Sequence, residues 1–500
     1  MKTTKRQYPG NLRGITGFFM APFASAFVGM SMSMLMLYFT DYSGIDTAMG
    51  KTGYAVAFGT VFLMLTRIID AVDDPVQGWL IDSSKECRFG KYRRFMFIGT
   101  AVLAVGGIML YAMPTAVKKN PFLLWGWAIV GYLLYDMGSA MSNITAALLQ
   151  KVTTDAAIRA KLAVALRLGC VIAAVPAIFY ATIVTIVGKN GNLGKAASQT
   201  AVILIMICCA IEWIGAGILK EPYLEKENEE HKSAVNFKEI GALLKISPLW
   251  VHSVGFLIGN MSYGLAAGVM LYFIKWYFCA DAATGTVNLV RFAALSGTYS
   301  LITLIPNFLS PFFTTFILRF FKTVDRSMSG CMMLISGGYF LIFLLNITGI
   351  MKASPILLFV LFFLIMIPSG VSAQFSVLLT IECADYAEYT IGRNMTALTS
   401  SIYNLTQKAS SAIGALIPGA LLIAVGYSVN EETGAYAGEL SSLPRMITGL
   451  SLILALVPAI MALISYIIYK NFYKITPEMR KTMSEELERR HSGQSKTDEG

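Results

Sequence analysis

The sequence predicts an all-α integral membrane protein with twelve transmembrane helices arranged in two pseudo-symmetric six-helix bundles. Three observations lead to this prediction. The 500 residues are 55% hydrophobic and only 14% charged, whereas a typical soluble protein has about 25% charged residues. Twelve segments are apolar over the roughly 20 residues that a bilayer-crossing helix needs. A strongly polar stretch, which contains EPYLEKENEEHK, separates the sixth segment from the seventh.

The twelve expected spans follow one another at short intervals, and hydropathy alone gives their approximate limits. They are 15–39, 54–80, 95–114, 121–148, 162–187, 197–219, 249–275, 291–317, 328–348, 355–380, 394–426 and 443–469. The first is too long for a signal-peptide core, and no small-residue cleavage site follows it. The predicted division is an N-terminal bundle, a cytoplasmic linker, a C-terminal bundle and a cytoplasmic tail, at 1–219, 220–248, 249–470 and 471–500.

A weak internal repeat supports two parallel halves. The leucine pair 148–149 precedes Asp155 by the same offset as the leucine pair 378–379 precedes Asp385. Each pair lies at the predicted inner end of the fourth span of its half. Parallel six-helix halves are the arrangement that such a repeat implies.

The distribution of Lys and Arg predicts that both termini are cytoplasmic. With this orientation, the cytoplasmic segments carry 28 of the 40 Lys and Arg residues, and the opposite side or its boundary carries nine. Basic residues favour the cytoplasmic side of short loops. The same distribution explains the net charge of +10 without a nucleic-acid partner. We expect a monomeric, multi-pass protein of the cell (plasma or inner) membrane, surrounded by lipid bilayer.

The sequence lacks the residue patterns of an enzyme or of a metal centre. Its seven Cys include no CxxC pair and lie mostly in or beside expected spans, where small thiols pack. The three His offer no zinc site and no His-based catalytic pair. The phosphate-binding loop GxxxxGK(S/T) is absent. We therefore expect a transporter without a cofactor, driven by an ion gradient, whose tail after Thr476 forms a short amphipathic or solvated helix.

The second expected span carries four charges in an otherwise apolar segment. Helical geometry puts Arg67, Asp70 and Asp74 on one stripe, with Asp73 beside it. A charge at the centre of a membrane helix costs roughly 2.5–3.5 kcal/mol on insertion scales, and such residues normally face a wet cavity or the protein interior. One Arg cannot neutralise three carboxylates, so we expect a bound cation. The alternative is an ion-pair cluster that only holds helices together.

Two further charges lie in the fourth and fifth expected spans. Asp136 has Tyr132 one turn before it and Asn143 two turns after it, which makes a polar stripe on the fourth span. Arg167 lies on the fifth span. A carboxylate accepts hydrogen bonds from sugar hydroxyls and Arg donates through a rigid fork, so this pair suits a hydroxyl-rich or anionic ligand. Alternatively, Asp136 and Arg167 only pair with each other.

The remaining membrane charges are Lys408, in the eleventh span, and Glu212, in the sixth. We expect Lys408 to pair with the carboxylates of the second span. A cation bound there would then compete with the pairing and couple ion to substrate. Glu212 lies nearer the inner end of its span, where it is expected to pair with a cation from a loop.

Several motifs together resemble one transporter family. The stretch RIIDAVDDPVQGWLID, followed by RFGKYRR, is similar to the second helix and following loop of the melibiose-permease-like transporters. These are the glycoside–pentoside–hexuronide:cation symporters of the major facilitator superfamily. LYFTDYSGI is similar to the end of the family's first helix, YLLYDMGSAMSN to its fourth helix, and ECADYAEYTIGRN to the loop before its eleventh. The resemblance covers nearly all of the chain and implies the major facilitator fold.

The resemblance also implies roles for the charged residues. It implies that Asp70 and Asp74 are cation ligands, for Na+ or H+, and Asp73, at a position where family members often carry Asn, is expected to join them. The residues expected to bind substrate are Ser25, Tyr132, Asp136, Asn143, Arg167 and Lys408. Those expected to act in gating or in a cytoplasmic salt-bridge network are Arg67, Asp82, Arg159, Glu382, Asp385, Glu388 and Arg393.

Three positions depart from the melibiose-type pattern. Ser25 stands where the family has a first-helix aspartate that binds galactosides, and Ala140 replaces a fourth-helix tryptophan that stacks on the sugar. Leu133 replaces a threonine associated with sodium. The loss of this hydroxyl, together with the extra Asp73, favours protons, because crowded carboxylates bind protons more readily. The sequence therefore leaves open both the sugar and the choice between Na+ and H+.

The leading interpretation is a symporter that imports a glycoside, oligosaccharide or hexuronide with Na+ or H+ by alternating access. The alternative is an uncoupled facilitator, or a carrier of an amphipathic, lipid-like substrate, on the same fold. Ser25 and Ala140 leave that alternative open, whereas Asp136 and Arg167 favour a polar ligand.

Overall fold

The computed structural model is almost entirely helical. It describes residues 11–83, 91–142, 148, 156–219, 246–281, 283–392, 396–424 and 427–494. Over these residues, ten helical segments are long and apolar enough to cross a membrane. The 30-residue α4 (Tyr54–Ser83) and the 22-residue α7 (Pro121–Ser142) add the second and fourth spans, for twelve within the described chain. The predicted all-α membrane fold is confirmed.

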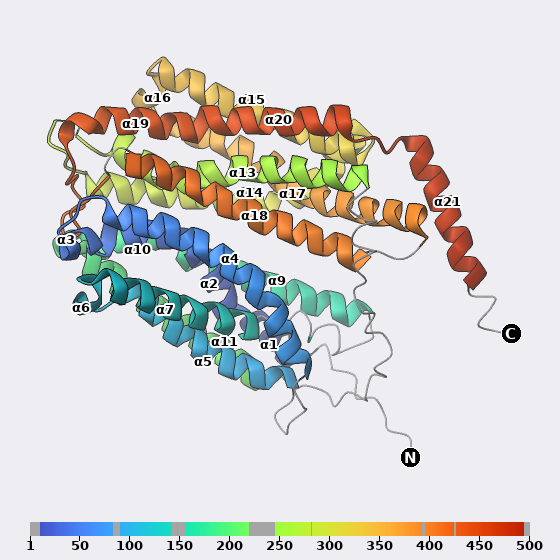
Figure 1. Ribbon diagram of the computed structural model, residues 1–500, viewed down its shortest axis with the longest axis horizontal. Helices are drawn as coiled ribbons and strands as arrows, with labels where there is room; N and C mark the ends of the chain where they lie inside the picture. Colours follow the sequence, from blue (N-terminus) through green and yellow to red (C-terminus); the bar gives the residue numbers. More distant parts are fainter. Residues whose placement is uncertain are drawn as a thin grey trace. The chain divides into compact units, whose positions relative to one another are not determined.

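The helices follow the expected spans closely (Figure 1). The first half contains α1 (Leu12–Met20), α2 (Phe23–Leu37), η1 (Tyr38–Tyr42), α3 (Ile45–Met49), α4, α5 (Lys91–Tyr111), α6 (Thr115–Lys118), α7, α9 (Ala156–Ile178), α10 (Tyr180–Val187), η2 (Gly188–Asn190) and α11 (Leu193–Ile218). The second half contains α13 (Ser247–Phe273), η3 (Ile274–Phe278), α14 (Leu289–Phe321), α15 (Val324–Ile347), α16 (Ile350–Ala353), α17 (Pro355–Ile391), α18 (Thr396–Ala424), η4 (Leu440–Ser442), α19 (Leu443–Ser451), η5 (Leu452–Leu456), α20 (Val457–Phe472) and α21 (Pro477–Gln494). The tail therefore begins with a helix, as expected.

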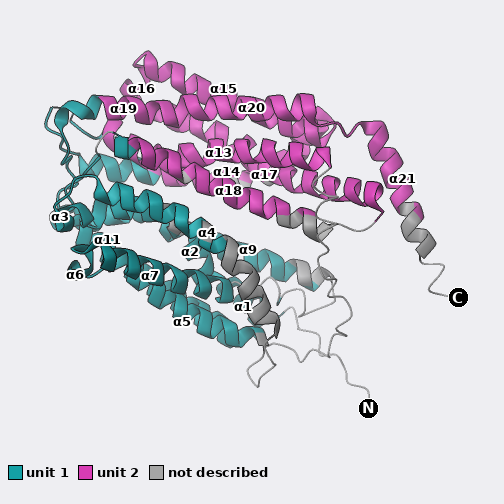
Figure 2. Cartoon of the chain, viewed as in Figure 1, with its two compact units in different colours: residues 1–229, 279–297, 422–444 teal, residues 230–278, 298–421, 445–500 magenta. Residues whose placement is uncertain are grey.

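The chain forms two compact units (Figure 2). Unit 1 contains residues 1–229, 279–297 and 422–444, and unit 2 contains residues 230–278, 298–421 and 445–500. Two regions that follow helices of unit 2 in the chain therefore belong to unit 1. The predicted bounds of the two bundles, the linker and the tail stay predictions.

Aromatic rings pack at the centre of unit 1, between η1, α4 and α7. The ring of Phe39 meets Phe62 edge to face, with 5.6 Å between the centroids. Phe62 meets Tyr132 in the same way at 5.9 Å. Such aromatic pairs contribute about 0.5–1.5 kcal/mol beyond the burial of their area. The three rings hold α4 against α7 and fix the position of Tyr132.

A buried histidine ties three helices of unit 2 together. His252 on α13 is 1% exposed. Its Nδ1 lies 3.0 Å from the hydroxyl of Tyr469 on α20, and its Nε2 lies 3.1 Å from the hydroxyl of Thr380 on α17. Both ring nitrogens are thus satisfied, as buried polar groups normally are. We interpret His252 as a packing residue.

Candidate cation and substrate site

The best-defined charged site lies between α4 and α7 in unit 1. Arg67 Nη1 lies 3.3 Å from Asp70 Oδ2, which is the expected contact between residues three apart on one helix face. Asp70 is 7% exposed. From α7, the hydroxyl of Tyr132 donates a hydrogen bond to Asp70 Oδ1. Asp70 is therefore a buried carboxylate that contacts a guanidinium on its own helix and a hydroxyl on α7, and these contacts orient it.

Asp136 extends this site by one turn of α7. Asp136 lies four residues after Tyr132 on the same helix, so the two side chains share one face of α7. Asp136 is partly buried, and Arg167 on α9 is exposed. The ion pairs within 4.0 Å in the described part of the chain do not include one between Asp136 and Arg167. The roles of Asp136 and Arg167, and the alternative in which they only pair with each other, stay predictions.

Ser25 lies at the start of α2 and is 8% exposed. Its hydroxyl donates to the carbonyl of Pro22 at 3.2 Å, and its backbone N–H points to Glu212 at 3.3 Å. The first span is broken here, because α1 ends at Met20 and α2 begins at Phe23. Ser25 therefore lies in the first turn of α2. The sequence predicted one continuous span here and not this break.

Some predicted site residues have side chains outside the described part of the structure. They are Asp73, Asp74, Asp82, Asn143, Arg159 and Arg393. Lys408 lies partly buried on α18 in unit 2, whereas Asp70 lies in unit 1. The roles of these residues, and the pairing of Lys408 with the carboxylates, stay predictions.

The predicted salt-bridge residues Glu382, Asp385 and Glu388 lie on the last turns of α17. Glu382 binds Arg480 from the tail helix α21, and Arg480 Nη2 also lies 2.6 Å from Asp325 at the start of α15. Burial opposes the charge of Arg480, but its hydrogen bonds to Glu382 and Asp325 outweigh burial and raise the pKa of the guanidinium. Sequence reasoning assigned no role to Arg480. The only signal was its place near the start of an amphipathic helix.

A second polar cluster lies at the opposite end of unit 1, where η1 and α3 meet residues 427–432. The buried hydroxyl of Tyr427 donates to Asp41 at 3.0 Å, and Ser428 donates to Asp46 at 2.8 Å. Lys118 on α6 donates to the carbonyl of Ser43 at 2.5 Å. Asp41 and Ser43 of this cluster belong to the motif LYFTDYSGI. The sequence alone did not predict which residues they contact.

Glu431 completes this cluster beside Gly44. Gly44 has φ +68°, and a Cβ at that position would overlap the Glu431 carboxylate. Burial raises the pKa of Glu431, Lys118 acts in the opposite direction, and Glu432 adds to the rise. Burial also lowers the pKa of Lys118. These interactions attach the 427–432 segment to the N-terminal helices of unit 1.

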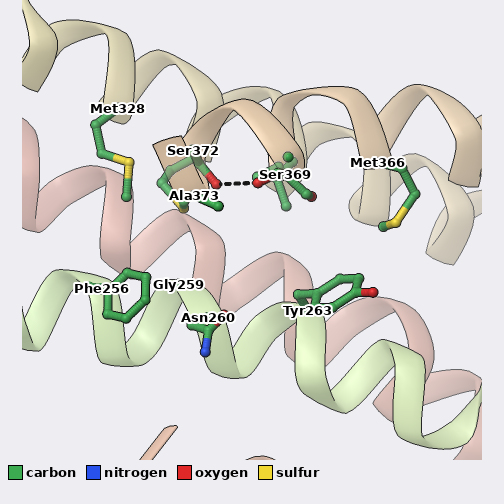
Figure 3. Close-up of a pocket in the computed structure, with 12 residues that line it drawn as sticks. Phe256, Gly259, Asn260, Tyr263, Met328, Met366, Ser369, Ser372 and Ala373 are labelled. Atoms are coloured by element: carbon green, nitrogen blue, oxygen red, sulfur yellow. Dashed lines mark hydrogen bonds between the residues drawn. The ribbon is translucent and has the colours of Figure 1, made fainter. Parts of the chain in front are cut away.

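Unit 2 contains a cavity of about 170 Å³ between α13, α15 and α17 (Figure 3). Its lining combines soft apolar side chains, including Phe256, Met328 and Met366, with polar residues such as Asn260 and Ser369. The cavity is smaller than the roughly 300–1,000 Å³ of typical small-molecule sites. None of the predicted site residues lines it. By itself it could hold only part of a ligand.

The described residues contain no group of three or more His, Cys, Asp or Glu side chains with the geometry of a metal site. The site chemistry within the described chain is that of a buried carboxylate, a hydroxyl and a guanidinium. Such groups can hold a small cation and form hydrogen bonds to a polar ligand.

The sequence matches the family model for MFS/sugar transport proteins over residues 17–477. The chain belongs to this family. It is 25% identical over 488 residues to the glucuronide carrier protein homolog of Escherichia coli strain K12, with 96% of each chain covered. It is 23% identical over 495 residues to the putative glycoside/cation symporter YagG of the same organism, covering 96% of this chain and 95% of that one.

The raffinose carrier protein of Pediococcus pentosaceus is 23% identical over 482 residues, which are 93% of this chain and 69% of the relative. The resemblance to the glycoside–pentoside–hexuronide:cation symporters is thus confirmed. The family and these relatives are membrane transporters, so the prediction of a transporter rather than an enzyme is also confirmed. The MFS/sugar transport protein described here is a multi-pass membrane protein.

Solved structures with the same fold include two transporters. The nucleoside transporter NupG has a TM-score of 0.55 and 16% identity, covering 93% of this chain and 98% of that one. The POT family transporter PepTSo has a TM-score of 0.57 and 13% identity, covering 94% and 99%. At these identities the likeness concerns the fold alone. It supports the expected major facilitator architecture.

Proposed function

We propose that this protein is a symporter that carries a glycoside or hexuronide across the cell membrane together with Na+ or H+, by alternating access. Relatives over almost the whole chain are named as a glucuronide carrier homolog and a putative glycoside/cation symporter. Both termini are cytoplasmic in this proposal, because most Lys and Arg lie in the segments that this orientation puts inside.

The observation that carries the proposal is the contact of Asp70 with Arg67 and Tyr132. A buried carboxylate in a membrane helix is costly, and it normally marks an ion or substrate path. Arg67 and Tyr132 give the Asp70 carboxylate a defined orientation. We propose that a cation binds Asp70, together with Asp73 and Asp74 on the same helix.

The substrate side of the proposal rests on Asp136 and Arg167. Arg167 is exposed, and the described chain has no acidic side chain within 4.0 Å of it. Its guanidinium is therefore available to bind a carboxylate through two parallel hydrogen bonds. Asp136 can accept from sugar hydroxyls. This combination favours a hexuronide or an acidic glycoside.

The test is uptake of radiolabelled glucuronides and neutral glycosides by proteoliposomes, with a Na+ gradient, a pH gradient or neither. We expect accumulation with one of the gradients, loss of the gradient effect in Asp70→Asn, and loss of uptake in Asp136→Asn. Glu485→Gln, which removes a charge from an exposed side chain on α21, is the matched control and should transport normally. Accumulation that is equal with and without both gradients would overturn coupling.

The second candidate is an uncoupled carrier of an amphipathic substrate. The apolar, methionine-lined cavity of unit 2 favours it, because Met side chains adapt to irregular apolar ligands. In the same proteoliposomes, this function predicts that a lipid-like glycoside is transported and that free sugars do not inhibit its transport. It also predicts that Met366→Ala changes transport, whereas Asp70→Asn does not.

A further inference from the structure

The break in the first span leaves backbone donors at the start of α2 inside the membrane. Pro22 stands at the break, and α2 begins at Phe23. The first N–H groups of a helix have no carbonyl partner within that helix. In a membrane, each unsatisfied group would cost several kcal/mol. Another part of the protein must therefore accept these hydrogen bonds.

Glu212 on α11 supplies the acceptor. Its Oε2 lies 2.8 Å from the N–H of Ala24 and 3.3 Å from that of Ser25. The side chain is 0% exposed. Gly215, one turn later, lets α11 approach the break, because a Cβ there would lie 2.8 Å from the backbone N of Ala21. Glu212 thus caps α2 from a neighbouring helix, and among the described residues it makes no pair with a loop cation.

The other oxygen of Glu212 meets a hydroxyl that has two partners. Thr100 Oγ1 on α5 lies 2.8 Å from Glu212 Oε1 and 2.7 Å from the carbonyl oxygen of Met96. A threonine hydroxyl has one proton, so it can donate fully to only one of these oxygens. If Glu212 is a neutral acid, its own O–H donates to Thr100, and Thr100 donates to Met96. Each contact then has its own hydrogen.

The surroundings of Glu212 contain no ion-pair partner in the described chain. The side chains that face the carboxyl are Thr100 from α5, Ser142 from α7, and the thiols of Cys208 and Cys209 from α11 itself. Arg93 on α5 donates to the carbonyls of Ala216 and Gly217 instead. The N-terminus of α2 offers only about half an elementary charge. That partial charge makes the ionised form accessible but does not neutralise it.

We propose that Glu212 is a proton-binding site, in which the bound proton completes the hydrogen-bonded chain from Glu212 through Thr100 to the Met96 carbonyl, and in which its loss tightens the cap of α2 and thereby shifts Ser25. When the proton is lost, the Thr100 hydroxyl can donate either to Glu212 or to the Met96 carbonyl, but not fully to both. The charged carboxylate also accepts stronger hydrogen bonds from the Ala24 and Ser25 N–H groups. Because Ser25 is a predicted substrate residue, sugar affinity depends on this proton. That last step rests on the proposed function.

The first test measures the proton directly and needs no substrate. Infrared spectroscopy of the purified protein near neutral pH should show the carbonyl band of a protonated carboxyl. The band should be missing in Glu212→Gln and present in Glu485→Gln, the exposed control on α21. Glu212→Gln should fold, because its amide can accept from the two N–H groups and donate to Thr100. A spectrum that Glu212→Gln leaves unchanged overturns the proposal.

The second test measures coupling. Sugar binding is followed by the thermal stabilisation that a proteoliposome-active sugar gives to the purified protein at several pH values. In the wild type we expect the apparent affinity to change severalfold with pH, and in Glu212→Gln we expect a clearly smaller change with pH. Suppose that the infrared band is missing in Glu212→Gln, but sugar affinity depends on pH in the same way in the wild type and in Glu212→Gln. Glu212 then binds a proton without coupling to sugar, and the link through Ser25 is wrong. If no sugar binds, the proposed function fails while the infrared result still decides the proton site.

Discussion

The hydroxyl of Tyr132 on α7 donates a hydrogen bond to Asp70 on α4, and this bond links two of the spans that carry the predicted cation and substrate residues. Arg67 lies on the same helix as Asp70, and its Nη1 is 3.3 Å from Asp70 Oδ2. Tyr132 is only 3% exposed, and its ring is held by Phe62. The position of the Asp70 carboxylate therefore depends on aromatic packing as well as on charge.

Removing this hydroxyl should weaken cation coupling without unfolding the protein. In Tyr132→Phe the ring keeps its contact with Phe62, but Asp70 loses a donor. A hydrogen bond to a charged group contributes about 1.5–3 kcal/mol, so we expect the cation concentration for half-maximal uptake to rise about tenfold or more. The measurement is uptake by proteoliposomes across a cation titration.

Tyr135→Phe is the matched control on the same helix. Its hydroxyl donates to the carbonyl of Val28 at 2.9 Å and does not contact Asp70. We expect a similar loss of thermal stability but an unchanged cation dependence. An equal shift in the cation dependence of both variants would contradict a specific role for the bond from Tyr132 to Asp70.

Arg480 should hold the tail helix against unit 2. Its guanidinium contacts Asp325 and Glu382, and all three side chains are less than a quarter exposed. Arg480→Ala leaves two partly buried carboxylates without this partner, and such a loss costs about 1–3 kcal/mol. We expect α21 to become sensitive to protease at a lower temperature than in the wild type. Arg489→Ala, which removes an ion pair of a 78% exposed side chain, should leave cleavage unchanged.

The pH dependence of unit 1 should include a contribution from Glu431. Its pKa in the folded protein is raised, chiefly by burial, so the folded state binds the proton more tightly than the unfolded state does. The stability that this group contributes therefore increases as pH falls through the folded pKa, and it is lost as pH rises. We expect Glu431→Gln to be as stable as the wild type in acid and more stable at neutral pH. Thermal midpoints across the acidic to neutral range measure this.

Glu432→Gln provides the comparison for Glu431. Glu432 is exposed, and among the hydrogen bonds of the described chain its side chain accepts only from the Asn192 amide, at 3.5 Å. Its replacement should leave the difference between acid and neutral stability nearly as in the wild type. If Glu432→Gln flattens the pH profile and Glu431→Gln does not, burial of Glu431 is not the cause.

The spans and the charges within them could be predicted from sequence because both depend on local composition. Apolar runs of the right length mark the helices, and the spacing of Arg67 and Asp70 predicts their contact on one helix face. Asp136 lies one turn after Tyr132 for the same reason. These features need no information about how distant parts of the chain pack.

The features that sequence reasoning missed depend on contacts between distant segments. The backbone N–H groups left unpaired by the break at Pro22 donate to Glu212, which is nearly 190 residues away in the chain. The contact of Tyr427 with Asp41 spans 386 residues. Neither pair leaves a local pattern, because a lone Glu or Tyr in an apolar segment has many possible partners. Only the fold identifies which partner it meets.

Gly44 offers a last test of the cluster around Glu431, because two effects there can be separated. Its φ of +68° disfavours any side chain, and a Cβ would also overlap the Glu431 carboxylate. Gly50 has a similar φ, +63°, but nothing within 4 Å of its Cβ position. We expect Gly50→Ala to cost about 1–2 kcal/mol from backbone strain alone, and Gly44→Ala to cost more.

The excess in Gly44→Ala should disappear when Glu431 is shortened. In the double variant Gly44→Ala, Glu431→Ala the overlap is removed, so the remaining cost should approach that of Gly50→Ala. Thermal or denaturant unfolding of the four proteins gives the coupling between the two positions. Additive effects of the two substitutions would mean that the Glu431 carboxylate does not rest against Gly44, and the segment at 427–432 would then be held mainly by Tyr427 and Ser428.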